Sequence, residues 1–283
     1  MAHNLLQAGY PLSVFNRTAS RCTALHTAGA QVASSPAAAA QQAEVLLLCV
    51  SDDQAAEAVL LGEPADQPPS PAATAAAMHG LQPGSLVVDC STISPATSRR
   101  LAAALAERQV SYLDAPVTGG TEGARAGRLS VLVGGDAADL ERARPLLEVL
   151  GNRITHFGPV GAGQEAKAVN QVLVAGSYAA VAEALALAER LELDRNQVVE
   201  ALKGGAAGSW ALEHRSAAMV NDHYPLGFKL ALHRKDLAIA LEAAAAAALE
   251  LPVSRLVAAM EDELMAGGHG ELDVSVLARW FRS

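Results

Sequence analysis

Lys167 and Asn170 are the two side chains whose types and spacing could carry out proton-transfer chemistry. They lie three residues apart in a predicted long helix from about Gln164 to Arg190, so both project from one helix face. A lysine can protonate a carbonyl oxygen, and remove that proton in the reverse direction, if burial or a neighbouring cation lowers its pKa. Asn170 could hydrogen-bond the lysine or a substrate. A lone helical lysine, however, is more often a solvated residue.

The segment Asp114-Ala-Pro-Val-Thr-Gly-Gly120 could bind a carboxylate. It follows a predicted strand, and Gly119 and Gly120 allow backbone N–H groups to close around an anion. The Thr118 hydroxyl would be a further donor. On the local sequence alone, an ordinary turn is an equally good interpretation.

Asn16-Arg17-Thr18 lies at the end of a predicted strand and bears on the choice of nucleotide. An acidic residue at such a position binds the ribose hydroxyls of NAD, whereas an arginine accommodates the extra phosphate of NADP. None of these three residues is acidic, which favours NADP(H), with NAD(H) as the alternative. A polar turn with a helix cap at Thr18 is the other interpretation.

The elements that must position these residues fall into two halves. Up to about Phe157, short apolar runs alternate with helical stretches, the pattern of an α/β Rossmann-type parallel sheet covered on both faces. After Gly158–Gly163 nearly all of the chain is predicted to be helical. We therefore expect an α/β domain over residues 1–160 and an all-α domain over residues 161–283. The predicted strands are Leu12–Asn16, Val45–Val50, Leu86–Cys90, Ser111–Asp114, Leu129–Val133 and Arg153–Phe157, and the later helices Arg195–Lys203, Trp210–Val220, Lys229–Glu250 and Val253–Met265.

Composition narrows the functional classes. The 283 residues carry a formal net charge of −9, which argues against a nucleic-acid partner because phosphate neutralisation needs a basic surface. No uninterrupted apolar run reaches the roughly 18 residues of a membrane helix, so we expect no membrane span. The three cysteines are far apart and odd in number, which favours a reducing, cytoplasmic setting. A proline-rich loop is predicted over residues 62–71, and Asp52–Asp53 are expected to cap a helix.

Five motifs occur in the order and spacing of the β-hydroxyacid dehydrogenases, the family of 3-hydroxyisobutyrate dehydrogenase and the glyoxylate/succinic semialdehyde reductases. The resemblance covers essentially the whole chain. Any one motif would be weak, but five in order are specific. They are Phe15-Asn-Arg-Thr18, Asp89-Cys-Ser-Thr92, Asp114-Ala-Pro-Val-Thr-Gly-Gly120, Gly161-Ala-Gly-Gln-Glu-Ala-Lys167-Ala-Val-Asn170 and Phe228 followed by Lys235-Asp236-Leu237.

The resemblance implies a role for each matching residue. It implies an NAD(P)-dependent oxidoreductase that interconverts a small aldehyde acid, such as glyoxylate, succinic semialdehyde or tartronate semialdehyde, and its hydroxyacid, or that acts on 3-hydroxyisobutyrate. Homodimers or homotetramers are usual in the family, and no metal is expected. The implied catalytic residues are Lys167 and Asn170, the substrate residues Thr118, Gly119, Gly120, Phe228 and Asp236, and the cofactor residues Asn16, Arg17, Thr18, Thr92 and Lys235.

Each of the later motifs has a plainer interpretation. Thr92 could cap the helix expected to begin near Pro95. Phe228 could be an ordinary core residue, and Lys235–Asp236 an ordinary solvated pair. Where the family usually has serine, this chain has Thr118, whose extra methyl would narrow a substrate pocket.

At its N-terminus this chain differs from the family that it resembles. The family opens with an apolar strand and a GxGxxG loop, followed by a segment like Met1-Ala-His-Asn-Leu-Leu-Gln-Ala-Gly-Tyr10, at which this chain begins. We therefore expect the first strand and the pyrophosphate-binding loop to be missing, and two sheet edges to be left unpaired, which would destabilise the chain. One alternative is a catalytically silent binding or assembly protein with the same fold. A lesser one is an imine reductase, against which Lys167 argues, because such relatives commonly replace it.

Overall fold

The computed structural model describes residues 1–62 and 75–282. Beyond Gly62, the predicted proline-rich loop lies outside the described residues. The chain divides into two compact units, Met1–Lys167 (unit 1) and Ala168–Ser283 (unit 2). Every strand among the described residues lies in unit 1, and the described part of unit 2 is helical. The predicted fold class, a Rossmann-type domain followed by an all-α domain, is therefore confirmed.

The main sheet of unit 1 has six strands in the order β3-β4-β5-β7-β6, with β8 paired to β7. β3, β4 and β5 run parallel, and β8 runs parallel to β7. β7 pairs antiparallel with both β5 and β6, which the prediction of a parallel sheet did not anticipate. The strands are β3 (Val45–Leu48), β4 (Leu86–Asp89), β5 (Ser111–Asp114), β6 (Val117–Thr118), β7 (Leu129–Gly134) and β8 (Gly151–Gly158).

A second, two-stranded parallel sheet is formed by β1 (Ser13–Val14) and β2 (Gln31–Val32). Within residues 1–62 and 75–282, no strand pairing joins it to the six-stranded sheet. The short helix α1 (Ala2–Gln7) precedes β1, and β1 itself is shorter than the predicted strand Leu12–Asn16.

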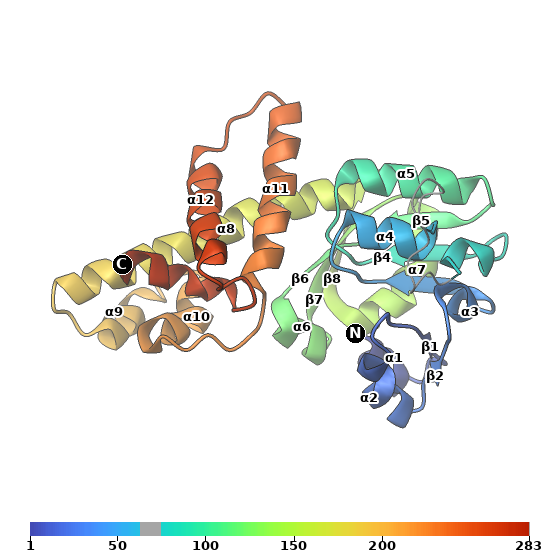
Figure 1. Ribbon diagram of the computed structural model, residues 1–283, viewed down its shortest axis with the longest axis horizontal. Helices are drawn as coiled ribbons and strands as arrows, with labels where there is room; N and C mark the ends of the chain where they lie inside the picture. Colours follow the sequence, from blue (N-terminus) through green and yellow to red (C-terminus); the bar gives the residue numbers. More distant parts are fainter. Residues whose placement is uncertain (63–74, 283) are drawn as a thin grey trace. The chain divides into compact units, whose positions relative to one another are not determined.

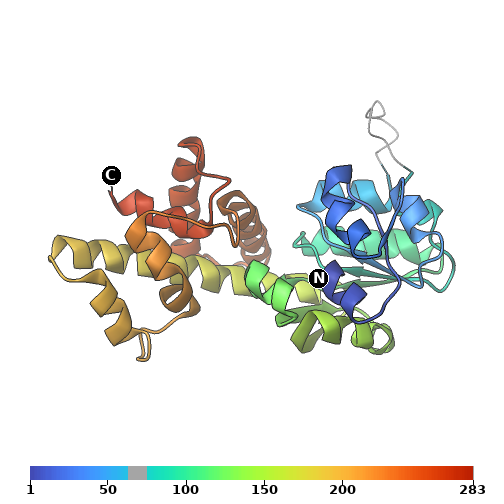
Figure 2. The ribbon, with the colours of Figure 1, turned by 90° about the horizontal axis from the view of Figure 1, so that it is seen from below.

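Helices cover both faces of the main sheet, as Figures 1 and 2 show. The alternation of side chains along β4 explains the two layers. Val87 joins a core with residues of α4 (Asp53–Leu60) and α5 (Pro95–Ala106). Leu86 and Val88 join a core with residues of α1 and α7 (Ala137–Leu150). Asp52 accepts a hydrogen bond from Ala55 N–H at the start of α4, so the predicted cap is confirmed. The remaining helices of unit 1 are η1 (Ala19–Cys22), α2 (Thr23–Thr27), α3 (Pro36–Ala40), α4 (Asp53–Leu60), η2 (Ala77–His79), α5 (Pro95–Ala106), α6 (Gly120–Ala126) and α7 (Ala137–Leu150).

Unit 2 is built around the helix α8 (Ala162–Arg190), which begins in unit 1. Its buried residues Ala175, Tyr178 and Leu185 belong to the apolar core of the unit. By length and composition alone α8 could also cross a membrane. The sequence analysis predicted no membrane span, because it considered only uninterrupted apolar runs. The same test is passed by core helices of globular domains. The other helices of unit 2 are α9 (Arg195–Leu202), α10 (Trp210–Asn221), α11 (Leu230–Ala246), α12 (Pro252–Ala266) and η3 (Val274–Arg282).

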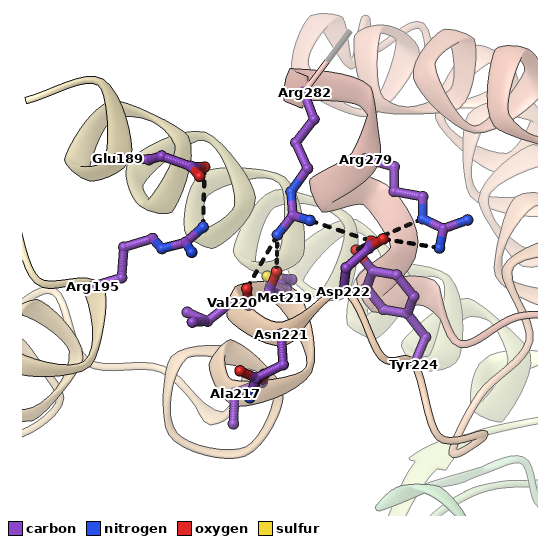
Figure 3. Close-up of polar contacts among 10 residues, drawn as sticks. All are labelled: Glu189, Arg195, Ala217, Met219, Val220, Asn221, Asp222, Tyr224, Arg279 and Arg282. Atoms are coloured by element: carbon purple, nitrogen blue, oxygen red, sulfur yellow. Dashed lines mark hydrogen bonds and ion pairs between the residues drawn. The ribbon is translucent and has the colours of Figure 1, made fainter. Parts of the chain in front are cut away.

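The C-terminal helix η3 is attached to the end of α10 by polar contacts (Figure 3). Two nitrogens of Arg279 donate to the Asp222 carboxylate at 2.9 and 3.1 Å, and the Tyr224 hydroxyl donates to it at 2.9 Å. Arg282 donates to the Met219 carbonyl. The hydrogen bonds from Arg279 lower the pKa of Asp222. The helix η3 is therefore part of the folded unit.

Candidate active site

The start of α8, which carries Lys167, is held by the end of strand β5. The Asp114 carboxylate accepts hydrogen bonds from the backbone N–H groups of Gly161 (2.7 Å) and Gln164 (2.9 Å). These donors have no partner within a helix, and a carboxylate also complements the positive end of the helix dipole. Asp114 is fully buried, and this burial raises its pKa. The contact fixes where the helix begins relative to the sheet.

Two glycines allow this close approach. A Cβ at Gly163 would lie 2.4 Å from the Leu132 carbonyl oxygen and 2.7 Å from that of Asp114. A Cβ at Gly134 would lie 2.6 Å from an Asp114 carboxylate oxygen. Real Cβ atoms essentially never come this near to such atoms, so only glycine fits at either position.

Gln164 connects the same helix to the loop that follows β4. Its Nε2 donates to the Ser91 carbonyl at 2.9 Å, and its Oε1 accepts from Ile93 N–H at 3.3 Å. Thr92, the predicted nicotinamide residue, lies between these two contacts and is half-buried. Ser94 caps α5 by accepting from Thr97 N–H. The interpretation of Thr92 as that cap is therefore wrong.

Lys167 lies in the first turns of α8 and is only 6% exposed. The plainer interpretation, a solvated helix lysine, is therefore wrong. Burial of an ammonium group is costly and uncommon outside paired or functional positions. Its catalytic role stays a prediction.

The predicted carboxylate-binding segment joins strand β6 to helix α6. Thr118 pairs with Ser130 across β6 and β7 and is half-buried, whereas Gly119 and Gly120 are exposed. Gly119 has φ +131° and Gly120 has φ +64°, backbone conformations that favour glycine. The exposed backbone of Gly119 and Gly120 therefore has the conformational freedom that it needs to bind an anion through its N–H groups.

Unit 2 brings Asn170, Lys235 and Asp236 together through Gln171, a residue that the sequence analysis missed. Gln171 Nε2 donates to Asp236 Oδ2 at 2.7 Å, and its Oε1 accepts from Asn170 Nδ2 at 2.6 Å. Lys235 Nζ lies 2.7 Å from the other Asp236 oxygen. Asp236 is 3% exposed, so the interpretation of Lys235–Asp236 as a solvated pair is wrong. The available signal was a second amide within the otherwise apolar run of α8.

Phe228 is half-buried beside the start of α11. Its backbone N–H donates to the buried Asp273 carboxylate at 2.9 Å, and its ring meets His233 edge-on at a centroid distance of 5.7 Å. His233 Nδ1 lies 2.6 Å from a carboxylate oxygen of Glu261, within hydrogen-bond distance, and both side chains are fully buried. Phe228 also packs against the core of unit 2, so a packing role and the predicted substrate role both fit its place.

Asn16, Arg17 and Thr18 are exposed after β1. Thr18 N–H donates to the Asn16 side chain at 2.9 Å. Thr18 precedes η1, but its side chain makes no capping hydrogen bond to that helix. The interpretation of Thr18 as a helix cap is therefore wrong. Arg17 has no ion-pair partner among the described residues, so its guanidinium is available to an anion. No cluster of three or more metal-ligating side chains occurs in the described part of the chain.

Two family models match the chain, one over its α/β part and one over its helical part. Residues 1–158 match the family model for the NAD binding domain of 6-phosphogluconate dehydrogenase. Residues 161–281 match the model for the NAD-binding domain of NADP-dependent 3-hydroxyisobutyrate dehydrogenase.

Individual relatives match over nearly the whole chain. An NAD-dependent L-serine dehydrogenase of Pseudomonas aeruginosa is 39% identical, covering 99% of this chain and 93% of its own. A 2-hydroxy-3-oxopropionate reductase of Escherichia coli is 38% identical, covering 99% and 91%. A solved 3-hydroxyisobutyrate dehydrogenase of Mycobacterium tuberculosis, with L-serine, superimposes with a TM-score of 0.85 at 30% identity, covering 100% and 94%. The chain therefore belongs to the β-hydroxyacid dehydrogenase family of NAD(P)-dependent oxidoreductases.

Proposed function

We propose that this chain reduces a small aldehyde acid to its hydroxyacid with NADPH, and that Lys167 is the general acid/base. The observation that carries the proposal is the burial of Lys167 on a helix whose start is held by Asp114 and Gln164. A buried lysine can have a pKa low enough to exchange a proton near neutral pH. The helix start also lies against the loop that carries Thr92.

The reaction needs three contributions from the chain. The nicotinamide, when bound, supplies the hydride to the carbonyl carbon. Lys167 gives a proton to the carbonyl oxygen in reduction and removes it from the hydroxyl in the reverse direction. Thr118, Gly119 and Gly120 hold the substrate carboxylate, so that binding energy remote from the reacting carbon orients it. Asn170 orients the lysine or the substrate, next to the network of Gln171 and Asp236.

The substrate is a short acid. The named substrates of two relatives, L-serine and 2-hydroxy-3-oxopropionate (tartronate semialdehyde), each have three carbons and a carboxylate. The methyl of Thr118 favours such a short acid over the longer succinic semialdehyde. The test is NADPH oxidation with glyoxylate, tartronate semialdehyde and succinic semialdehyde, and the reverse reaction with L-serine and 3-hydroxyisobutyrate. The highest kcat/KM is expected for tartronate semialdehyde; the highest value for succinic semialdehyde would contradict this choice.

Arg17 is the basis for the NADPH preference. Replacing it by glutamate removes a cation that can pair with the 2′-phosphate and adds a group that accepts from ribose hydroxyls. We expect Arg17→Glu to weaken NADPH binding by about 10- to 100-fold, corresponding to the loss of one charge-assisted contact. NADH binding should be unchanged or stronger. Fluorescence titration with both nucleotides measures this.

The control for this change is Arg108→Glu, at an exposed arginine just after α5 that belongs to none of the predicted binding segments. It should leave both affinities within about twofold, because a distant exposed charge is screened by salt. Equal affinity of the native chain for NADPH and NADH would contradict the preference. The name of the P. aeruginosa relative specifies NAD, so this comparison is informative in either direction.

A second copy of the chain covers the exposed face of α8. Along this helix Val169, Leu173 and Leu187 are each at least 60% exposed, with Ala180 and Ala184 exposed between them. Their spacing places them on one face, and a continuous exposed apolar stripe of this kind favours a protein–protein interface. Sedimentation of the native chain should give a dimer or tetramer, and Leu173→Glu with Leu187→Glu should give a monomer. The exposed Glu183→Gln is the control, and a monomeric native chain would contradict the assignment.

A further inference from the structure

We infer that Gln164 is a positioning residue for the proposed reaction, because its amide fixes the backbone on both sides of Thr92 to the helix that carries Lys167. The inference rests on the proposed function. In this role Gln164 holds the loop that carries Thr92 and the helix that carries Lys167 at a fixed distance from each other.

The two hydrogen bonds of Gln164 match the donor and acceptor of one side-chain amide. Nε2 donates to the Ser91 carbonyl at 2.9 Å, and Oε1 accepts from Ile93 N–H at 3.3 Å. The side chain is 1% exposed, so neither contact competes with bulk water. A primary amide offers both a donor and an acceptor at the end of a chain of this length, independently of pH. Thr92 lies between the two bonded residues.

The rest of the loop is held without Gln164. The Ser91 hydroxyl accepts from Val50 N–H at 2.8 Å, and Ser94 donates through its backbone and its hydroxyl to Asp53 at 3.0 and 2.6 Å. These bonds tie the loop to the segments around α4. Loss of the Gln164 amide should therefore leave the loop folded but release the Ser91 carbonyl and the Ile93 N–H, which flank Thr92.

The start of α8 is also held without the Gln164 side chain. Asp114 accepts from the backbone N–H groups of Gly161 and Gln164, which any side chain at residue 164 would preserve. Lys167 lies three residues further on, on the same side of the helix. The Gln164 side chain thus links the residues on both sides of Thr92 directly to the helix segment of Lys167. A shift of about 1 Å between reacting groups can cost about 100-fold in rate.

Three variants test this assignment. Gln164→Met keeps the length and the apolar packing but removes both hydrogen bonds. Gln164→Glu keeps the acceptor for Ile93 N–H, and its carboxyl can donate to the Ser91 carbonyl only when protonated. Gln197→Met, at an exposed position on α9, is the matched control.

Two readouts are measured, and the first does not need turnover. Hydrogen exchange of a short peptide containing Ile93 should be about tenfold faster in Gln164→Met than in the native chain, while a peptide from β4 is unchanged. Second, kcat should fall by about 10- to 100-fold with KM for the aldehyde acid within about twofold. Relative to the native chain, Gln164→Glu should have a higher kcat at low pH, where the introduced carboxyl is protonated, than at high pH.

The outcomes separate the inference from the proposed function. Native exchange at Ile93 with native kcat in Gln164→Met would overturn the positioning role. A large fall in melting temperature, with kcat and KM changed together and no pH-dependent recovery in Gln164→Glu, would also overturn it, because the residue would then be structural only. Faster Ile93 exchange in a chain whose native form reduces no aldehyde acid would support the link to Thr92 and reject the proposed function.

Discussion

Replacing Lys167 by methionine is expected to lower kcat for aldehyde-acid reduction by about 10²- to 10⁴-fold, the range for loss of a general acid/base. Methionine keeps the length and apolar character of the lysine stem but carries no proton. Lys167 is 6% exposed, so circular dichroism is used to check that unit 1 of the variant remains folded. NADPH affinity should stay within a few fold. Steady-state NADPH oxidation and nucleotide titration measure the two effects.

The control is Lys203→Met, at an exposed lysine paired with Glu200 at the end of α9. Such a pair contributes little, so activity and stability should both remain native. A Lys167→Met variant with kcat within tenfold of the native value would reject the assigned role. A variant that loses NADPH binding as well would mean that the lysine acts in cofactor binding instead.

Replacing Gly163 by alanine is expected to destabilise unit 1 by more than about 3 kcal/mol, which is large for one methyl group. The added Cβ would lie 2.4 Å from the Leu132 carbonyl oxygen and 2.7 Å from the Asp114 carbonyl oxygen. Both oxygens belong to the backbone of the sheet and cannot rotate away. The start of α8 would therefore have to move away from β5 and β7. Urea unfolding followed by circular dichroism measures the loss.

The matched control is Gly204→Ala, after α9, where a Cβ would meet no atom within 4 Å. Its unfolding free energy should lie within about 0.5 kcal/mol of the native value. Native stability in Gly163→Ala would show that the helix start can move without cost. The close packing of α8 on the sheet would then not position Lys167.

The sequence pattern predicts the two-part fold correctly because buried strands and helices differ in residue composition and period. Leu86–Asp89 is a continuous buried strand, as its apolar run indicates. The reversal of β7 was not predicted, because composition does not determine strand direction. The end of β1 at Val14 was also missed, since a strand's length depends on the neighbour with which it pairs.

The candidate site was only partly predictable for a related reason. The resemblance identified Lys167, Asn170 and Asp236 from motifs that are local in the sequence. It did not identify Gln164 or Gln171 as links, because their partners are distant: Ser91 lies 73 residues from Gln164, and Asp236 lies 65 residues from Gln171. Such contacts depend on tertiary packing. The same packing decides that Lys167 is buried, where composition alone favoured an exposed side chain.

In the proposed reaction, hydride passes from NADPH to the carbonyl carbon of an aldehyde acid while Lys167 supplies the proton. The most direct measurement uses NADPH deuterated at the transferred position, with tartronate semialdehyde as substrate and mass spectrometry of the product. We expect the native chain to form a hydroxyacid with one deuterium on the former carbonyl carbon, and this product to be lost in Lys167→Met. Unlabelled product, no product from a folded native chain, or equal product from the variant would contradict it.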